Sequence, residues 1–502
     1  MKETRKLTTP SLSPKSLRGR IEYKWIVLSV TTIGALMAAI DSTIVILALP
    51  DMLVQLHADL VEMIWVIMGY ILVSTVFLLT FGRVADMFGR VRMYNLGFVV
   101  FTVGSALCGL AGDASQLIAF RLVQGAGAAM MVVNSVAIIT EAFPPHERGQ
   151  ALGINAITFA AGGVIGPILG GFILTVASWR WIFFVNVPIG LFGALWGYLV
   201  LKEMSIRKRG ESFDPVGAIT FSLSLVSILL ALTLGIQYSW LSAPIVILFA
   251  AFAVLLPVFL WWERRTSNPM LDFSLFRDRV YSFSVLTAMT QSLALFAVNF
   301  LIVFYLQGVR GYDPLRAALL LIPLPLMIAV TAPPSGRIAD RIGARIPASV
   351  GLLIQCIGLA WLTQLTPTTP YVQIAFGLAL VGLGGGLFYP SNTSAAMNAA
   401  PARRLGVASA TLATLRQAGM VTSFALSLAV AAAALPRDVM MQLFVGTNVV
   451  LGSKVTQEFV IGMHSAFWVS LALGMVGIAF SVIRGKENRR QPATSGAAGG
   501  GE

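Results

Sequence analysis

Apolar stretches of about 20 residues, the length that a helix needs to cross a lipid bilayer, recur along the whole chain. A helix also satisfies its own backbone hydrogen bonds, which hydrocarbon cannot do. The stretches are continuously apolar and do not alternate with polar residues, which excludes a closed β-barrel. The sequence therefore predicts an all-α polytopic membrane protein.

Fourteen spans are predicted, and they form two six-helix bundles with two extra transmembrane helices between them. The expected spans are 24–49, 62–82, 93–112, 115–141, 151–176, 181–201, 215–235, 243–262, 280–306, 315–334, 347–365, 371–395, 407–434 and 462–483. The expected segments are a disordered cytoplasmic N-tail (1–23), a first bundle (24–201), a linker of two transmembrane helices with cytoplasmic loops (202–279), a second bundle (280–484) and a disordered C-tail (485–502).

The basic residues predict how the spans are oriented. Of the 35 Lys and Arg, 28 lie in the two tails and in the loops that follow even-numbered spans. Five lie in the other loops, and Arg121 and Arg416 lie within spans. Cytoplasmic loops carry the excess of Lys and Arg in membrane proteins. Both termini are therefore expected to be cytoplasmic.

Composition narrows the expected partners. Charged residues make up 11% of the chain, against about 25% in ordinary soluble proteins. The net charge of +13 is spread over loops on one side of the membrane, so we expect membrane lipids and no nucleic acid as partners. Cys108 and Cys356 lie within spans, and His57, His146 and His464 are far apart. No disulfide or metal site is therefore expected. The protein is also expected to be a monomer.

The string Gly-Arg-x-Ala-Asp-x-x-Gly occurs twice, each time after the second span of a bundle. Two copies at equivalent places indicate a duplicated helical unit. Glycine at both ends of the string permits a tight turn between spans. The candidate residues are Gly82, Arg83, Asp86, Gly89 and Arg90 in the first copy and Gly336, Arg337, Asp340 and Gly343 in the second.

Asp86 is expected to cap the N-terminus of the third span. The arginines of the first copy can pair with Asp86, or with Glu141 and Glu147. In the second copy, Ala344 stands where the first copy has Arg90, which predicts weaker contacts there. A purely structural turn with solvated arginines is the alternative interpretation.

Several strings together resemble the major facilitator superfamily over about residues 24–484. Arg121 with Gln124-Gly125-Ala126-Gly127 resembles its fourth-helix arginine motif, and 162–171 resembles its fifth-helix antiporter motif. The strings at 41–50 and 179–188 are similar to motifs of the fourteen-span drug:proton antiporters. The resemblance implies a transporter in the inner cell membrane. It also implies that the repeated string is a latch, which holds one conformation and breaks in the other.

The fifth span carries a glycine face. Gly162, Gly166 and Gly170 recur every four residues, and Gly171 and Pro167 accompany them. Small residues let helix backbones approach closely in lipid, and Pro167 removes a backbone donor and can bend the helix. The resemblance implies that this face also seals the cavity against leak; helix packing alone is the alternative.

Asp41 is the one acidic residue clearly embedded in the middle of a span. Burial favours a protonated carboxyl, as a proton carrier requires; the alternative is a neutral Asp41 that bonds Thr43 or a neighbouring helix. Arg121 is a permanent cation that needs Asp41, Glu141 or backbone carbonyls as partners. The resemblance implies that Arg121 takes part in proton transfer, with a structural pin as the alternative. Proton coupling is assigned to Asp41, Arg121 and Glu141. Arg416 occupies a similar place in the second bundle. Two interpretations stay open for it: a functional charge like Arg121, or a structural charge near the cytoplasmic side.

The favoured function is proton-coupled antiport that exports small lipophilic or amphipathic compounds such as drugs, cationic or neutral, by alternating access. The alternatives are an exporter of lipids or of an endogenous metabolite, a facilitator or importer, and a membrane-embedded enzyme. The chain has no GxxxxGK[ST] phosphate loop, so ATP-driven pumping is not expected. The sequence shows no cluster of catalytic acids, bases or metal ligands near one membrane face, so we expect no enzyme activity and no cofactor besides protons. The expected substrate-cavity residues are Gln124, Asn134, Asn155, Gln291, Phe296, Asn299, Tyr389 and Asn392.

Overall fold

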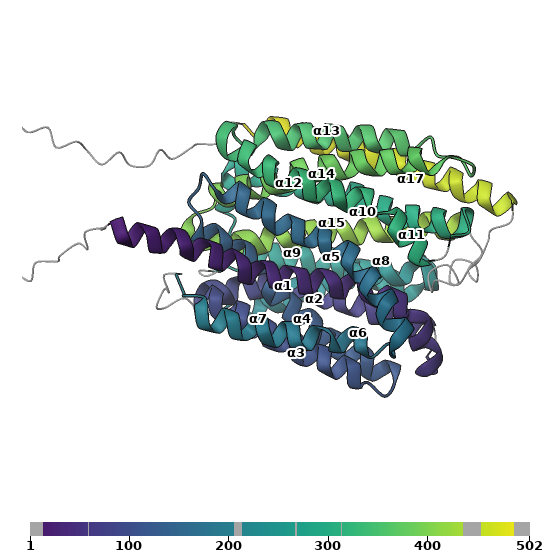
Figure 1. Ribbon diagram of the computed structural model, residues 1–502, viewed down its shortest axis with the longest axis horizontal. Helices are drawn as coiled ribbons and strands as arrows, with labels where there is room; N and C mark the ends of the chain where they lie inside the picture. The colour runs from purple at the N-terminus through teal and green to yellow at the C-terminus, as the bar shows by residue number, and fades with distance from the viewer. Residues whose placement is uncertain are drawn as a thin grey trace, which may run out of the picture.

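The computed structural model describes residues 14–58, 60–204, 213–266, 269–312, 314–434 and 453–485. Every regular element in these ranges is a helix, as predicted (Figure 1). The first half contains α1 (Pro14–Gln55), α2 (Leu60–Phe88), α3 (Arg90–Leu110), α4 (Ala114–Ala142), α5 (Arg148–Val176), α6 (Trp181–Phe184) and α7 (Asn186–Val200). The middle contains α8 (Pro215–Tyr238) and α9 (Ala243–Glu263). The second half contains η1 (Leu275–Arg277), α10 (Arg279–Phe304), η2 (Tyr305–Val309), α11 (Pro314–Leu320), α12 (Pro323–Ile342), α13 (Arg345–Leu362), α14 (Tyr371–Ala399), η3 (Ala402–Arg404), α15 (Leu405–Ala434) and α17 (Ser453–Ile483).

Twelve helices in the described ranges are long and apolar enough to cross a membrane, and they coincide with twelve of the fourteen predicted spans. The other two predicted spans correspond to α10, with 26 residues, and α15, with 30 residues. Both helices are long enough to cross a bilayer, and some side chains of each lie outside the described residues. Membrane-crossing character is therefore shown for twelve helices.

The two halves repeat the same packing of helices. In the first half, α4 packs against α2 and α3, and α1 packs against α5. In the second half, α14 packs against α12 and α13, and α10 packs against α15. The halves lie side by side in Figure 1, purple to blue below and green to yellow above, and they meet where α5 packs on α12 and α2 packs on α15. The duplicated string thus belongs to a duplicated three-dimensional unit.

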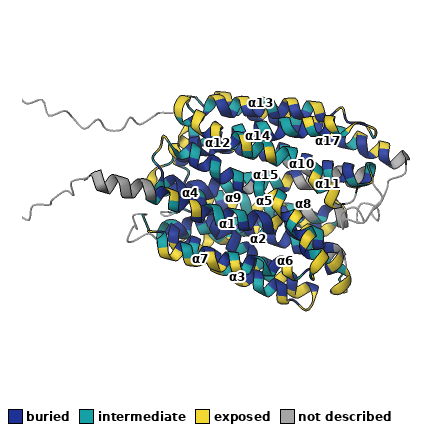
Figure 2. Ribbon diagram, in the orientation of Figure 1, coloured by how far each residue is buried: buried dark blue, intermediate teal, exposed yellow. Residues whose placement is uncertain are grey.

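Large apolar side chains cover the outside of the bundle. Figure 2 shows exposed residues along the outer helices and buried residues between helices. Along α7, for example, Leu191, Leu195 and Leu199 are all more than half exposed. An apolar outer surface of this extent suits contact with lipid hydrocarbon.

The two extra helices cover the junction between the halves. On α8, Leu225 and Leu229 pack with Val76 of α2 and Val421 of α15. Phe259 of α9 is buried in a cluster that also contains residues of α2, α4 and α15. Other faces of this pair are exposed and apolar. The pair therefore combines a lipid-facing surface with contacts to both halves.

Four local features differ from the predicted boundaries. The N-tail was expected to end at residue 23, but α1 begins at Pro14, where a proline suits the first turn of a helix. The sixth predicted span breaks at Val185 into α6 and α7, and the tenth breaks ahead of Pro323 into α11 and α12. The first copy of the repeated string is helical up to Phe88 and does not form a loop. The predicted tails at 1–13 and 486–502, and the side chains of Phe296 and Asn299, lie outside the described residues.

Candidate functional site

A buried ion pair lies inside the first half. Asp41 of α1 is 0% exposed and Arg121 of α4 is 1% exposed. Arg121 Nη1 donates a hydrogen bond to Asp41 Oδ2 over 2.7 Å. Gln124 Nε2 and Asn186 Nδ2 each donate to Asp41 Oδ1 over 2.8 Å. Three donors from α4 and α7 therefore converge on one carboxyl group of α1.

Arg121 contacts several protein groups besides Asp41. Its Nε donates to the Val66 carbonyl over 3.0 Å, and its Nη1 also donates to Gln124 Oε1 over 2.6 Å. The guanidinium carbon lies 4.2 Å from the centre of the Tyr70 ring, which adds a cation–π contact. This set of partners explains how a permanent cation is held deep inside the bundle.

Asn186 was absent from the predicted site residues. It is the first residue of α7, directly after the break at Val185, and it is 0% exposed. Its side chain reaches Asp41 of α1. A lone asparagine within an apolar span was the available sequence signal, because a buried amide needs a partner.

Two residues expected to contact this cluster have other partners. Glu141 was grouped with Asp41 and Arg121, but it binds Arg90, with Arg90 Nη1 donating to Glu141 Oε2 over 3.1 Å. Glu141 is twenty residues from Arg121 on one helix, which is about 30 Å along the axis. Thr43 was the alternative partner of Asp41, but its hydroxyl donates to backbone carbonyls, including that of Gly162.

The first copy of the repeated string links the two halves through Asp86. The Asp86 carboxylate accepts hydrogen bonds from the backbone N–H groups of Gly406, over 3.0 Å, and Val407, over 2.9 Å. These are the first residues of α15, so Asp86 caps a helix of the other half. Arg90 donates to Asp86 through both Nε and Nη2, and its Nη2 also donates to the Ala402 carbonyl. We call this group the first latch.

The predicted role of Asp86 at the third span is therefore wrong. The N-terminus of α3 is capped instead by Glu203, which accepts from the backbone N–H groups of Arg90, Val91 and Arg92. Only Gly89 of this copy takes a positive φ, of 114°. Gly82 lies within α2, where a Cβ atom would stand 2.9 Å from the Gly406 carbonyl oxygen. Close approach of α15, rather than a turn, makes glycine necessary at this position.

The second copy forms an equivalent link, the second latch, between α12 and α5. Asp340 accepts hydrogen bonds from the backbone N–H groups of Gly149 and Gln150, each over 3.0 Å. Gly336 meets Gly149 so closely that a Cβ atom on Gly336 would stand 2.0 Å from the Gly149 carbonyl oxygen. Gly343 takes a positive φ of 97°, as Gly89 does in the first copy.

The two latches differ in their arginines. Arg90 donates hydrogen bonds to Asp86, whereas Asp340 accepts hydrogen bonds from backbone N–H groups and interacts with Arg148 only electrostatically. Arg83 is 8% exposed and lies in the electrostatic field of Glu263 on α9. Its counterpart Arg337 is exposed.

Both latches lie at the same end of the bundle. Arg90 of the first latch bonds Ala402, and Arg148, next to the second latch, donates to Asn398 Oδ1 over 2.8 Å. Asn398 and Ala402 flank the short connection between α14 and α15. The structure therefore represents a conformation in which the two halves are held together at this end.

We expect the first latch to contribute more stability than the second. Asp86→Asn loses hydrogen bonds from the Arg90 guanidinium as well as two strengthened backbone bonds, whereas Asp340→Asn loses two strengthened backbone bonds and the more distant attraction of Arg148. We predict losses of about 2 and about 1 kcal/mol respectively, measured by thermal unfolding of the purified protein in detergent. Asp278→Asn, which changes a helix cap within one half, is the control and should be near neutral. Equal losses for Asp86→Asn and Asp340→Asn would contradict the prediction.

The glycine face of α5 packs on α1. A Cβ atom on Gly162 would stand 2.4 Å from that of Ala39, and one on Gly166 would stand 1.9 Å from the Thr43 hydroxyl. Gly170 meets Ile44 in the same way, at 2.9 Å from its side chain. Pro167 lies inside α5, and a Cβ on Gly171 would meet only Leu315 of α11, at 3.4 Å. Close packing of α5 on α1, within one half, accounts for these three glycines.

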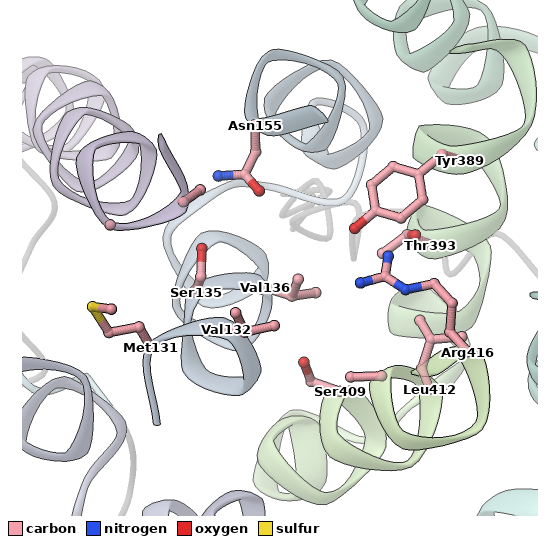
Figure 3. A pocket seen from close by; sticks show the side chains of 13 residues that line it. Met131, Val132, Ser135, Val136, Asn155, Tyr389, Thr393, Ser409, Leu412 and Arg416 are labelled. Atoms are coloured by element: carbon pink, nitrogen blue, oxygen red, sulfur yellow. The ribbon is translucent and has the colours of Figure 1, made fainter. Parts of the chain in front are cut away.

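A cavity lies between the two halves, enclosed by α1, α4, α5, α14 and α15 (Figure 3). In this conformation the cavity is narrow, with a volume of about 20 Å³, and part of it opens to solvent. Of the predicted cavity residues, Asn155 and Tyr389 line it, and Figure 3 shows both side chains at its edge. Arg416 also lines it from α15. Ser135, Thr393 and Ser409 line it as well and were not predicted, since isolated hydroxyl groups in a span carry no distinctive sequence signal.

The other described candidates lie elsewhere. Gln124 belongs to the Asp41 cluster. Asn134 is buried and donates to the Met130 carbonyl. Asn392 donates to the Ser284 carbonyl and accepts from Arg484. Gln291 is partly buried and is not among the described residues that line the cavity.

Comparison with known proteins decides the family. The model of the Major Facilitator Superfamily matches residues 31–424. The chain belongs to the Major Facilitator Superfamily. Among relatives, multidrug resistance protein Stp of Mycobacterium tuberculosis (strain CDC 1551 / Oshkosh) is 35% identical over 396 residues, which cover 79% of this chain and 73% of Stp.

Two further proteins match most of the chain. The riboflavin transporter RibZ of Clostridioides difficile (strain 630) is 28% identical over 466 residues, which cover 92% of this chain and 98% of RibZ. The crystal structure of the human organic anion transporter MFSD10 has a TM-score of 0.63 at 15% identity, and covers 90% of this chain and 99% of MFSD10. That structural likeness shows the fold alone.

Proposed function

We propose that this Major Facilitator Superfamily transporter is a proton-coupled antiporter that exports lipophilic or amphipathic compounds. The observation that carries the proposal is the buried pair of Asp41 and Arg121. A carboxyl group wholly inside a membrane bundle is rare and is best explained by a functional role. The multidrug resistance name of Stp, 35% identical to this chain, supports export of such compounds.

The hydrogen bonds of Asp41 suggest how proton binding moves helices. As an anion, Asp41 holds α1 to α4 through Arg121 and Gln124, and to α7 through Asn186. Protonation removes the negative charge and occupies one acceptor oxygen with hydrogen. The attraction to Arg121 then weakens, and α1 is freer to move against α4 and α7. Because α1 also packs on α5, which enters the second latch, this change reaches the contact between the halves.

Alternating access requires a conformation in which both latches are broken. Arg90, Asp86 and Asp340 join the halves only through polar contacts at one end, and such contacts can separate into water. We place this end at the cytoplasm, because it carries most of the basic residues. On this assignment the structure is closed to the cytoplasm, and both termini are cytoplasmic in an inner cell membrane.

We also propose that α10 and α15 cross the membrane, which makes fourteen spans. We further propose that protons are the coupling ion and that a single chain is the working unit. Both helices pack with α17 in the second half, at the positions that α1 and α5 hold in the first. Duplicated packing of this kind places each helix in the same environment as its counterpart.

Transport of an endogenous metabolite is the second candidate. The observation that favours it is the relative RibZ, a riboflavin transporter that matches 92% of this chain. The same fold and the same buried pair would serve both functions.

The experiment uses purified protein in liposomes with a trapped pH dye. A panel of lipophilic drugs, labelled lipids and riboflavin is added in turn. The proposal predicts that a transported compound moves protons in the opposite direction. Transport of any of them without a proton signal would refute antiport, and transport of riboflavin alone would favour the metabolite.

A further inference from the structure

The cavity between the two halves carries one positive charge and no negative one. Thirteen described residues line it; Arg416 is the charged residue among them, and none is acidic. We infer that the substrate of this transporter is an amphipathic organic anion whose acidic group binds Arg416, an inference that rests on the proposed transport function. The substrate expected from the sequence was cationic or neutral, so the cavity changes that expectation.

Arg416 differs from the other arginines held inside the bundle. Arg121 binds Asp41, Gln124 and the Val66 carbonyl, and Arg90 binds Asp86 and Glu141. In the described structure Arg416 makes a cation–π contact instead, in which its guanidinium carbon lies 4.9 Å from the centre of the Tyr389 ring. The ring orients the guanidinium group through its face but neutralises none of the charge. The N–H donors of Arg416 therefore remain available to a ligand with acceptor oxygens.

Neutral donors face Arg416 from the first half. Ser135 Oγ on α4 and Asn155 Nδ2 on α5 have no hydrogen-bond partner among the described residues, although the two side chains are only 5% and 3% exposed. Buried polar groups are normally paired in proteins. Figure 3 shows Ser135 and Asn155 on one side of the cavity and Arg416 with Tyr389 on the other. A ligand rich in acceptor atoms would satisfy donors from both halves.

The remaining walls suit an apolar body. Met131, Val132, Val136 and Leu412 line the cavity beside the polar groups. Ligand sites typically combine apolar walls with a few placed polar groups, and the lining of this narrow cavity has both, so it would take a ligand once the halves move apart. A cation would be repelled by Arg416 with no carboxylate of the lining to offset it. An aromatic or lipophilic acid is therefore the class of molecule that this cavity binds best.

The bond between such an anion and Arg416 also joins the halves. Arg416 and Tyr389 belong to α15 and α14, whereas Ser135 and Asn155 belong to α4 and α5. A bound anion would therefore contact both halves at once. This arrangement is the one that lets substrate binding influence their relative movement.

Binding of three probes with one aromatic body tests the inference. The probes are 1-pyrenesulfonate, neutral 1-pyrenemethanol and the (1-pyrenylmethyl)trimethylammonium cation, whose charges do not depend on pH. Binding to the purified full chain is measured at equal pH throughout, without a proton gradient. The wild-type protein should bind the sulfonate at least about tenfold more tightly than the ammonium cation, as one charge-assisted contact allows.

Variants of Arg416 separate a ligand contact from general packing. Arg416→Gln should weaken sulfonate binding about tenfold to a hundredfold and leave pyrenemethanol binding unchanged, while Arg416→Lys should lose less because the charge remains. Arg316→Gln is the matched control, because Arg316 lies 4.5 Å from the Tyr312 ring at the exposed surface. Gel filtration confirms that each variant is folded, and Arg416→Lys carries the test if Arg416→Gln is not folded.

Three results would overturn the inference: ammonium binding at least as tight as sulfonate binding, equal weakening of all three probes by Arg416→Gln, or no binding of any probe. Liposomes with the pH dye then distinguish this inference from the proposed function. Sulfonate transport that depends on Arg416 but moves no protons would refute the antiport and keep the anion site. Proton-coupled transport of the ammonium cation alone would keep the antiport and refute the anion site.

Discussion

Asp41→Asn is expected to reduce proton-coupled export at least about hundredfold while folded protein remains in the membrane. The variant cannot exchange a proton, and its amide places a second donor where Arg121 Nη1 now donates to Asp41 Oδ2. Arg121 keeps Val66, Gln124 and the Tyr70 ring as partners, so the helix bundle should still form. The measurement is substrate-dependent proton movement into liposomes, at matched amounts of inserted protein.

Asp113→Asn is the control for Asp41→Asn. Asp113 caps α4, the helix that carries Arg121, by accepting from the Gln116 N–H over 2.8 Å. Asparagine caps helices as well as aspartate does, so this variant removes the same charge with little structural effect. Export at the wild-type rate by an equally abundant Asp41→Asn variant would refute proton coupling through Asp41 and would return the carboxyl group to a structural role.

Gly336→Ala is expected to open the contact between α5 and α12. The added Cβ atom would stand 2.0 Å from the Gly149 carbonyl oxygen and 2.7 Å from the Gln150 nitrogen, and both are backbone atoms that cannot rotate away. Overpacking of this kind costs about 1–3 kcal/mol, which shifts a two-state equilibrium by roughly tenfold to a hundredfold. Spin labels at the exposed positions His146 and Arg341 should report a longer distance than in the wild-type background.

Gly163→Ala provides the matched control for Gly336→Ala. Gly163 lies within α5, and a Cβ atom there meets nothing within 4 Å. Alanine favours helix over glycine, so this variant should keep the wild-type label distance and transport rate. An unchanged label distance in Gly336→Ala would show that this contact does not hold the closed conformation.

Much of the fold could be predicted from residue patterns. Twelve predicted spans coincide with membrane-length apolar helices, because the hydrocarbon core imposes length and polarity directly on each segment. The duplicated string at Gly82 and Gly336 predicted two equivalent units, and α2 and α12 occupy equivalent places in them. The breaks at Val185 and ahead of Pro323 were not predicted, since overall hydropathy does not register a local interruption of the helix within one apolar segment.

Part of the candidate site could also be predicted from the sequence, and part could not. Asp41 and Arg121 stood out because a charge within a span is costly and needs a partner, and the structure pairs them. Their remaining partners come from residues such as Asn186, which reaches α1 from α7. Asp86 was assigned to the helix that follows it in sequence, whereas it caps α15, more than three hundred positions away.

The sequence by itself determined the membrane-spanning helices, their duplication and the need for a buried partner to Arg121. These properties follow from the chemistry of each segment in hydrocarbon, which does not depend on its neighbours. Only the tertiary structure decided that Asp86 and Asp340 each cap a helix of the opposite half, and that Arg416 meets the central cavity without an acidic partner among the described residues. Such contacts join residues that are distant in sequence, so the packing of whole helices, rather than any local pattern, brings them together.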